Sequence, residues 1–132
     1  MARSVEELLV LFGLESQAET DARNLTFGQL RFLEIARAIA MRPRILLLDE
    51  PAAGLNESER NKLAALVRGF RDQGIGMLLV DHDVPFVFGL CDHMTVMNFG
   101  SVIASGDPQE IHRHPAVREA YLGDDAATVE AR

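Results

Sequence analysis

The stretch Ile45-Leu46-Leu47-Leu48-Asp49-Glu50 decides the fold, because four aliphatic residues run directly into two acidic ones. A short continuous apolar run is typical of a strand buried on both faces of a parallel sheet. Ligands of α/β proteins bind at the carboxyl edge of such a sheet, where these two acids would lie. Adjacent side chains of an extended chain point in different directions, so one carboxylate can hold a metal ion while the other polarises a water molecule. The alternative is a pair of solvated acids at a strand end.

The rest of the chain alternates helix and strand, which indicates an α/β fold. Apolar spacing and capping residues predict a first helix that stops at Gly13, a short helix opened by Asp83, and helices starting at Pro108 and Pro115. The longer predicted elements are helices over 28–41 and 56–70, strands over 45–48 and 77–80, a hairpin of 93–98 with 101–105, and a frayed tail over 124–132.

Composition narrows the class of protein. The chain has 132 residues, of which 48% are apolar and 25% charged, with a net charge of −7. This balance argues against disorder and against non-specific nucleic-acid binding. No apolar run approaches the roughly 20 residues that a membrane span needs. The single cysteine, Cys91, excludes an internal disulfide framework and a zinc site built on several thiolates. We therefore expect a cytoplasmic protein.

Two further segments carry candidate chemistry. Thr26-Phe27-Gly28-Gln29 opens the helix over 28–41, and a hydroxyl, an amide and free backbone N–H groups at a helix N-terminus suit an anion. The alternative is a capped helix with Thr26 as its cap. His82 follows the second strand and can donate to a phosphate oxygen, or it is a surface residue of a loop. The remaining histidines, at positions 93, 112 and 114, have no ligand spacing with Cys91 and are given no metal role.

The order and spacing of these motifs resemble the C-terminal half of an ATP-binding-cassette (ABC) nucleotide-binding domain, over nearly the whole chain. Residues 25–29 resemble the family signature, residues 45–50 resemble Walker B with its catalytic glutamate, residues 51–56 resemble the D-loop, and His82 resembles the switch histidine. Within the family, the sequence looks like that of the ATP-binding subunits of branched-chain amino acid importers. The positions that carry this likeness are Phe27, residues 51–56, Cys91-Asp92, residues 106–108 and the ending 115–123.

The resemblance implies a partial P-loop NTPase fold. Residues 1–42 would be the end of the helical subdomain with the signature. Residues 43–106 would hold Walker B, the D-loop, the switch histidine and the hairpin, and residues 107–132 the C-terminal helices and tail. The expected partners are a second nucleotide-binding subunit across ATP and the permease subunits, at the inner face of the plasma membrane.

The resemblance also implies the cofactors and the site residues. ATP and Mg²⁺ would be bound, with Asp49 holding the metal through water. Glu50 would orient or deprotonate the attacking water, and His82 would contact the γ-phosphate. The residues implied to contact the nucleotide, largely on the partner's side, are Thr26, Phe27, Gly28, Gln29 and Asn56.

The phosphate-binding loop G-x-x-x-x-G-K-[ST] does not occur in this sequence, and its one lysine, Lys62, lies in a predicted amphipathic helix. Thr26, Phe27 and Asn56 also replace the family's serine, glycine and aspartate. We therefore expect a half domain, which is either a split or truncated gene product or a piece of a longer chain. We expect it to be inactive alone and to have uncovered apolar faces.

Three functions remain open from the sequence. The first is the ATPase subunit of an importer, with branched-chain amino acids as its cargo. The second is a catalytically silent remnant or interaction module that pairs with a separate N-terminal half. The third is the ATPase of a lipid or polysaccharide exporter.

Overall fold

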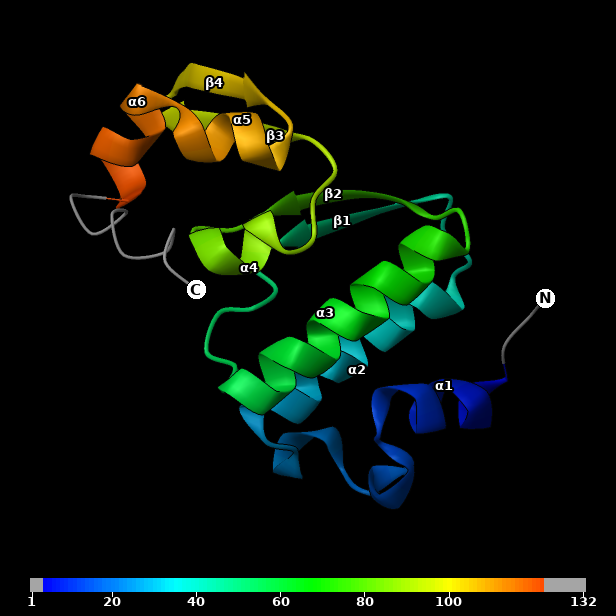
Figure 1. Ribbon diagram of the computed structural model, residues 1–132. Coiled ribbons are helices and arrows are strands. Elements are labelled where there is room, and N and C mark those ends of the chain that lie inside the picture. Colours follow the sequence, from blue (N-terminus) through cyan, green and yellow to red (C-terminus); the bar gives the residue numbers. More distant parts are fainter. Residues whose placement is uncertain (1–3, 123–132) are drawn as a thin grey trace. The chain divides into compact units, whose positions relative to one another are not determined.

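The computed structural model describes residues 4–122, which form two compact units, one ending at Phe86 and one beginning at Val87. In chain order, the first unit holds α1 (Val5–Phe12), the 3₁₀ turns η1 (Glu15–Gln17) and η2 (Ala22–Asn24), α2 (Phe27–Ala40), β1 (Ile45–Asp49), α3 (Glu57–Asp72) and β2 (Gly76–Val80) (Figure 1). A short helix, α4 (Val84–Phe88), spans the boundary. The alternation of helix and strand predicted for this part is confirmed.

Three aromatic rings meet in the otherwise aliphatic core of the first unit, between α1, α2 and α3. Phe12 stacks on Phe70 of α3 with ring centroids 6.0 Å apart, and it meets Phe32 of α2 at 6.4 Å. The predicted stripe of α3 is buried as expected, with Leu63 fully enclosed. Such aromatic contacts contribute about 0.5–1.5 kcal/mol each beyond the area they bury. This core fixes the two long helices that precede and follow β1.

The buried face of α2 differs from the prediction. We expected Leu30, Leu33 and Ala38 among its core contacts, but Leu30 is exposed and neither of the others is fully buried. The buried apolar residues are Phe32, Ile35, Ala36 and Ile39, together with Gly28. Phe32 follows the helix start at Phe27 by five residues, and its i+3, i+4 and i+7 neighbours share the face that meets Phe12.

The sheet of the first unit is a parallel pair, with Ile45 opposite Gly76 and Asp49 opposite Val80. The predicted parallel pairing is confirmed, but the predicted burial of both faces is wrong. Leu46 and Leu48 are 6% and 7% exposed, whereas Leu47 is 70% exposed. Successive strand residues point to opposite faces. On the other face the exposed side chains are Ile45, Leu47, Leu78 and Val80, because no other element of the first unit packs on them.

The second unit is a hairpin covered by short helices. β3 (Met94–Asn98) pairs antiparallel with β4 (Ser101–Gly106), as predicted, and α5 (Pro108–Arg113), α6 (Pro115–Val117) and a π turn (Arg118–Leu122) follow. Phe99 and Gly100 both have positive φ, as the type I′ form of a two-residue hairpin turn requires. Ala104, Ile111 and Val117 form the small core of this unit. The predicted tail, 124–132, lies outside the described residues.

Among residues 4–122, four helices begin with a capping box, and the caps predicted at Thr26 and Asn56 are among them. Ser4, Thr26, Asn56 and Asp107 each form a capping box with the residue three positions later. Each box satisfies two backbone N–H groups that the helix itself leaves without a partner.

Among residues 4–122, none of the helices has both the length and the apolar composition to cross a membrane.

Candidate functional site

The carboxyl edge of the parallel pair brings two of the predicted site residues together. Asp49 ends β1, and Glu50 donates its backbone N–H to the carbonyl of Val80 at 2.7 Å, which extends the ladder by one bond. The imidazole Nδ1 of His82, just past β2, lies 3.3 Å from Glu50 Oε1. The side chains of His82 and Glu50 are 74% and 54% exposed. An acid and an imidazole in contact, open to solvent at a sheet edge, can act on a ligand that arrives there.

Glu50 has φ of 45°, in the left-handed region that non-glycine residues rarely adopt. The conformation turns the chain off the strand, so that Pro51 and Ala52 are buried directly after it. A strained residue beside reactive groups is typical of functional sites, where the surrounding structure holds it in place.

The metal ligand predicted at Asp49 is an exposed carboxylate at the strand end. Carboxylate oxygens are ligands that Mg²⁺ prefers, and Mg²⁺ commonly binds through one or two carboxylates while it keeps several waters. Asp49 therefore suits a largely hydrated Mg²⁺. Within residues 4–122, no three His, Cys, Asp or Glu side chains gather closely enough to hold a metal ion without such waters.

The segment predicted to bind nucleotide at the start of α2 forms a capping box here. Gln29 N–H donates to Thr26 Oγ1 at 3.2 Å, and Thr26 N–H donates to Gln29 Oε1 at 2.9 Å. In this structure the side chains of Thr26 and Gln29 therefore cap α2, as the alternative interpretation of this segment predicted. Their role toward a nucleotide stays a prediction, since both side chains lie at the exposed helix end.

Phe27 and Gly28 join the start of α2 to other parts of the first unit. A Cβ on Gly54 would lie 2.7 Å from the Phe27 ring, and a Cβ on Gly28 would lie 2.1 Å from a carboxylate oxygen of Glu59. Gly54 therefore lets the loop after Glu50 approach the Phe27 ring. Asn56 ends that loop and caps α3 by accepting the Glu59 N–H at 2.9 Å, as predicted.

Sequence reasoning missed two residues beside this edge. The side chain of Asp81 is only 1% exposed and accepts backbone N–H groups from Asp83 and Ala52. Arg60 of α3 donates to the carbonyl of Leu55 and pairs with Asp83. The Asp-His-Asp triplet over 81–83 was a sequence signal for Asp81. No local pattern indicates Arg60, because its partner Asp83 lies 23 positions away.

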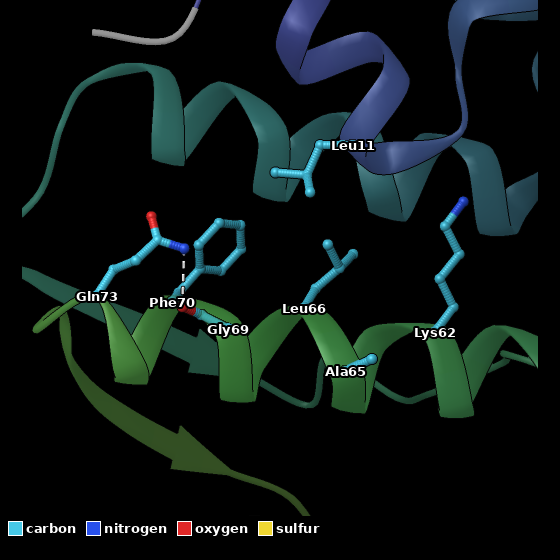
Figure 2. Close-up of a pocket in the computed structure, with 7 residues that line it drawn as sticks. All are labelled: Leu11, Lys62, Ala65, Leu66, Gly69, Phe70 and Gln73. Carbon is cyan, nitrogen blue, oxygen red and sulfur yellow. Dashed lines mark hydrogen bonds between the residues drawn. The ribbon is translucent and has the colours of Figure 1, made fainter. Parts of the chain in front are cut away.

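Lys62, the one lysine, lies away from any phosphate loop. Its Nζ donates to the carbonyl of Phe12, at the end of α1, and stands 4.9 Å from the centroid of the Phe32 ring. Beside it lies a groove of about 320 Å³ between α1 and α3 (Figure 2). The groove is mostly apolar, and Gln73 at its far end donates to the carbonyl of Gly69. Lys62 is therefore a structural residue that caps α1.

Comparison with known proteins identifies the class. Residues 1–53 match the family model for ABC transporters, and residues 101–127 match the model for branched-chain amino acid ATP-binding cassette transporters. A solved ATP-binding cassette of an ABC transporter in its ADP conformation superposes with a TM-score of 0.78 at 29% identity, over 89% of this chain and 48% of that one. The chain belongs to the ABC transporter ATPases and has the fold of part of their P-loop NTPase domain. The predicted resemblance and fold class are confirmed.

The curated relatives point to two kinds of transporter. The high-affinity branched-chain amino acid transport ATP-binding protein BraF of Pseudomonas aeruginosa is 46% identical over 81% of this chain and 42% of its own length. The lipopolysaccharide export system ATP-binding protein LptB of Acidithiobacillus ferridurans is 42% identical over 90% of this chain and 49% of its own length. The chain thus spans about half the length of the curated relatives it matches.

Proposed function

We propose that this chain is the C-terminal part of the ATP-binding subunit of an ABC importer, which couples ATP hydrolysis to the transport of branched-chain amino acids. The observation that carries the hydrolytic part is the 3.3 Å contact between His82 and Glu50 at the end of the parallel pair. Support for the cargo comes from residues 101–127, which match the branched-chain amino acid transporter model.

In this proposal each residue at the edge has one task. Asp49 would hold Mg²⁺ through water, and the bound ion would neutralise charge on the phosphate oxygens. Glu50 would accept a proton from the attacking water or orient it. Since His82 Nδ1 faces Glu50, its Nε2 is the ring atom available to a γ-phosphate oxygen. Most of the rate gain would come from positioning and charge stabilisation.

The remaining contacts would come from two subunits. The residues that would face the nucleotide bound to a second copy of the subunit are Thr26, Phe27, Gly28, Gln29 and Asn56. Permease subunits at the membrane would receive the movement that ATP hydrolysis drives in the two subunits. The ATPase would then be peripheral, at the inner face of the plasma membrane. A second candidate, the ATPase of a lipopolysaccharide-type exporter, is favoured by the 42% identity to LptB over 90% of the chain.

The test of the hydrolytic role is Glu50→Gln in a complete subunit that contains this segment. The amide keeps the shape but loses the basicity, so we expect ATP binding to persist and turnover to fall by about 10²-fold or more. Glu57→Gln, an exposed acid in the first turn of α3, is the matched control and should leave turnover unchanged. Undiminished turnover of Glu50→Gln would remove Glu50 from the base role.

The cargo is tested separately, by uptake of labelled leucine in cells that lack their own branched-chain amino acid ATPase. Uptake restored by the complete subunit, and lost again with Glu50→Gln, supports the importer. Restored export of lipopolysaccharide in a strain depleted of its export ATPase, without leucine uptake, would favour the exporter. An intact complete subunit with no hydrolysis in any setting would favour the catalytically silent module.

A further inference from the structure

Two loops meet at the carboxyl edge of the β1–β2 pair. The first loop, residues 51–56, joins β1 to α3 and begins directly after Glu50. The second loop, residues 81–83, follows β2 and has His82 at its centre. The backbone ladder between the strands ends with the bond from Glu50 to Val80. Beyond that bond, side chains hold the two loops together.

Asp81 makes the first connection. Its side chain is 1% exposed, and a buried carboxylate is costly unless it accepts hydrogen bonds. Oδ1 accepts the N–H of Asp83 at 2.9 Å, within the second loop. Oδ2 accepts the N–H of Ala52, in the first loop, in a longer bond of 3.4 Å. Ala52 is itself 1% exposed, so water does not compete for either group.

Arg60 makes the second connection, from the first turns of α3. Its Nε donates to the carbonyl of Leu55 at 3.1 Å, near the end of the first loop. Its Nη1 donates to Asp83 Oδ2 at 2.6 Å, at the end of the second loop. The planar guanidinium presents donors in two fixed directions, which an ammonium group does not do. The other carboxylate oxygen of Asp83 accepts the N–H of Phe86 and so caps α4.

We propose that Arg60 and Asp81 are positioning residues that couple the 51–56 loop to His82. Together they join the beginning and the end of the first loop to the residues on either side of His82. A movement of the first loop therefore displaces the imidazole relative to Glu50. This inference rests on the proposed function, in which Glu50 and His82 serve ATP hydrolysis.

The connection is tested first without activity, by amide hydrogen exchange in the 132-residue chain. Arg60→Met should speed exchange at Asp83 and Phe86, whose N–H groups donate to the carboxylates on either side of His82. Asp81→Asn should speed exchange at Ala52. Each effect should be about tenfold, because a hydrogen bond to a charged group is lost. Amides of the α3 core, such as that of Leu66, should keep their rates. Arg23→Met is the control, since it breaks an exposed ion pair of 2.7 Å with Asp21 that links no loops. Unchanged exchange in both loops would overturn the connection.

The second measurement is turnover in the complete subunit. Arg60→Met and Asp81→Asn should lower kcat at least tenfold while KM for ATP changes less than twofold, because geometry is lost and the phosphate contacts remain. Arg60→Lys, which keeps the charge without the two-directional donor, should recover only part of kcat. Wild-type kcat in Arg60→Lys or in both other variants would overturn the positioning role.

Failure of the proposed function gives a different result. If the wild-type complete subunit binds ATP without hydrolysing it, the function falls and the exchange rates alone decide the connection between the loops. If the wild type hydrolyses ATP and the variants match it, the function stands and the positioning role falls. Should Asp81→Asn not fold, Arg60→Met and Arg60→Lys carry the same comparison.

Discussion

At the scale of single residues, Glu50 combines an exposed carboxylate with a left-handed backbone. For an L-residue this conformation costs roughly 1–2 kcal/mol, whereas glycine adopts it without a steric penalty. Loss of the side chain and relief of the strain can therefore be separated by comparing two variants at one position. Both Glu50→Ala and Glu50→Gly remove the contact with His82, and only the second removes the strain.

We expect Glu50→Gly to unfold at a higher temperature than Glu50→Ala. A difference of about 1 kcal/mol would shift the midpoint by roughly 2–4 °C in a chain of this size. Thermal unfolding followed by circular dichroism measures it. If the alanine variant proved the more stable, Glu50 would not be held at positive φ in solution.

Cys91 is a second residue with a distinct environment. Burial raises the pKa of its thiol, and the charge of Asp92 raises it further. The thiolate is the reactive form, so less of it is present at pH 8 than in an exposed cysteine. We expect iodoacetamide to alkylate Cys91 more slowly than it alkylates glutathione at that pH. Asp92→Asn should lower the pKa and speed the reaction, and equal rates for glutathione and the native chain would contradict the assignment.

Some residues at the carboxyl edge of the β1–β2 pair could be predicted from the sequence, and others could not. Asp49, Glu50 and His82 follow apolar strands, and parallel pairing brings strand ends to one edge, so their proximity was predictable. The Thr26 and Asn56 caps are local patterns and were also predictable. The Asp-His-Asp triplet over 81–83 marked Asp81 but not its bond to Ala52. Arg60 was not predictable, because its bond to Asp83 depends on how the loops fold back on one another.

At the scale of elements, the uncovered face of the β1–β2 pair is unusual for a folded protein, because it exposes a contiguous aliphatic surface. Its four aliphatic side chains are exposed, and the parallel pair has two free strand edges among the described residues. The sequence predicted burial on both faces because an unbroken apolar run implies it. The prediction failed at Ile45 and Leu47 because a covering layer is a property of the assembled domain, not of the strand.

This face should drive association of the 132-residue chain. Leu47→Thr and Leu78→Thr place β-branched polar residues on it, and both native side chains are more than half exposed. We expect the double variant to stay monomeric at concentrations where the native chain associates, with an unfolding temperature within a few degrees of the native one. Sedimentation velocity gives the comparison. Leu46→Thr, on the buried face, is the contrast and should destabilise the fold.

At the scale of the whole molecule, the sequence has strand-end acids and a histidine without a glycine-rich phosphate loop. Charge-assisted hydrogen bonds contribute about 1.5–3 kcal/mol each, so loss of three such contacts costs about 4.5–9 kcal/mol. That corresponds to three or more orders of magnitude in affinity. We expect the 132-residue chain alone to bind Mg-ATP weakly and to hydrolyse none above background. Isothermal titration and phosphate release test this, and micromolar binding with turnover would contradict it.

Lys62 has a practical consequence, because the chain has no other lysine. Amine-directed reagents can modify only this side chain and the α-amino group, and in the folded chain the ammonium is bound to the end of α1. Reductive methylation with ¹³C-formaldehyde would therefore give a single side-chain NMR signal. Its shift, displaced by the neighbouring Phe32 ring, would report whether α1 is docked. The chain thus contains a natural single-site probe for following the attachment of its first helix during folding or subunit assembly.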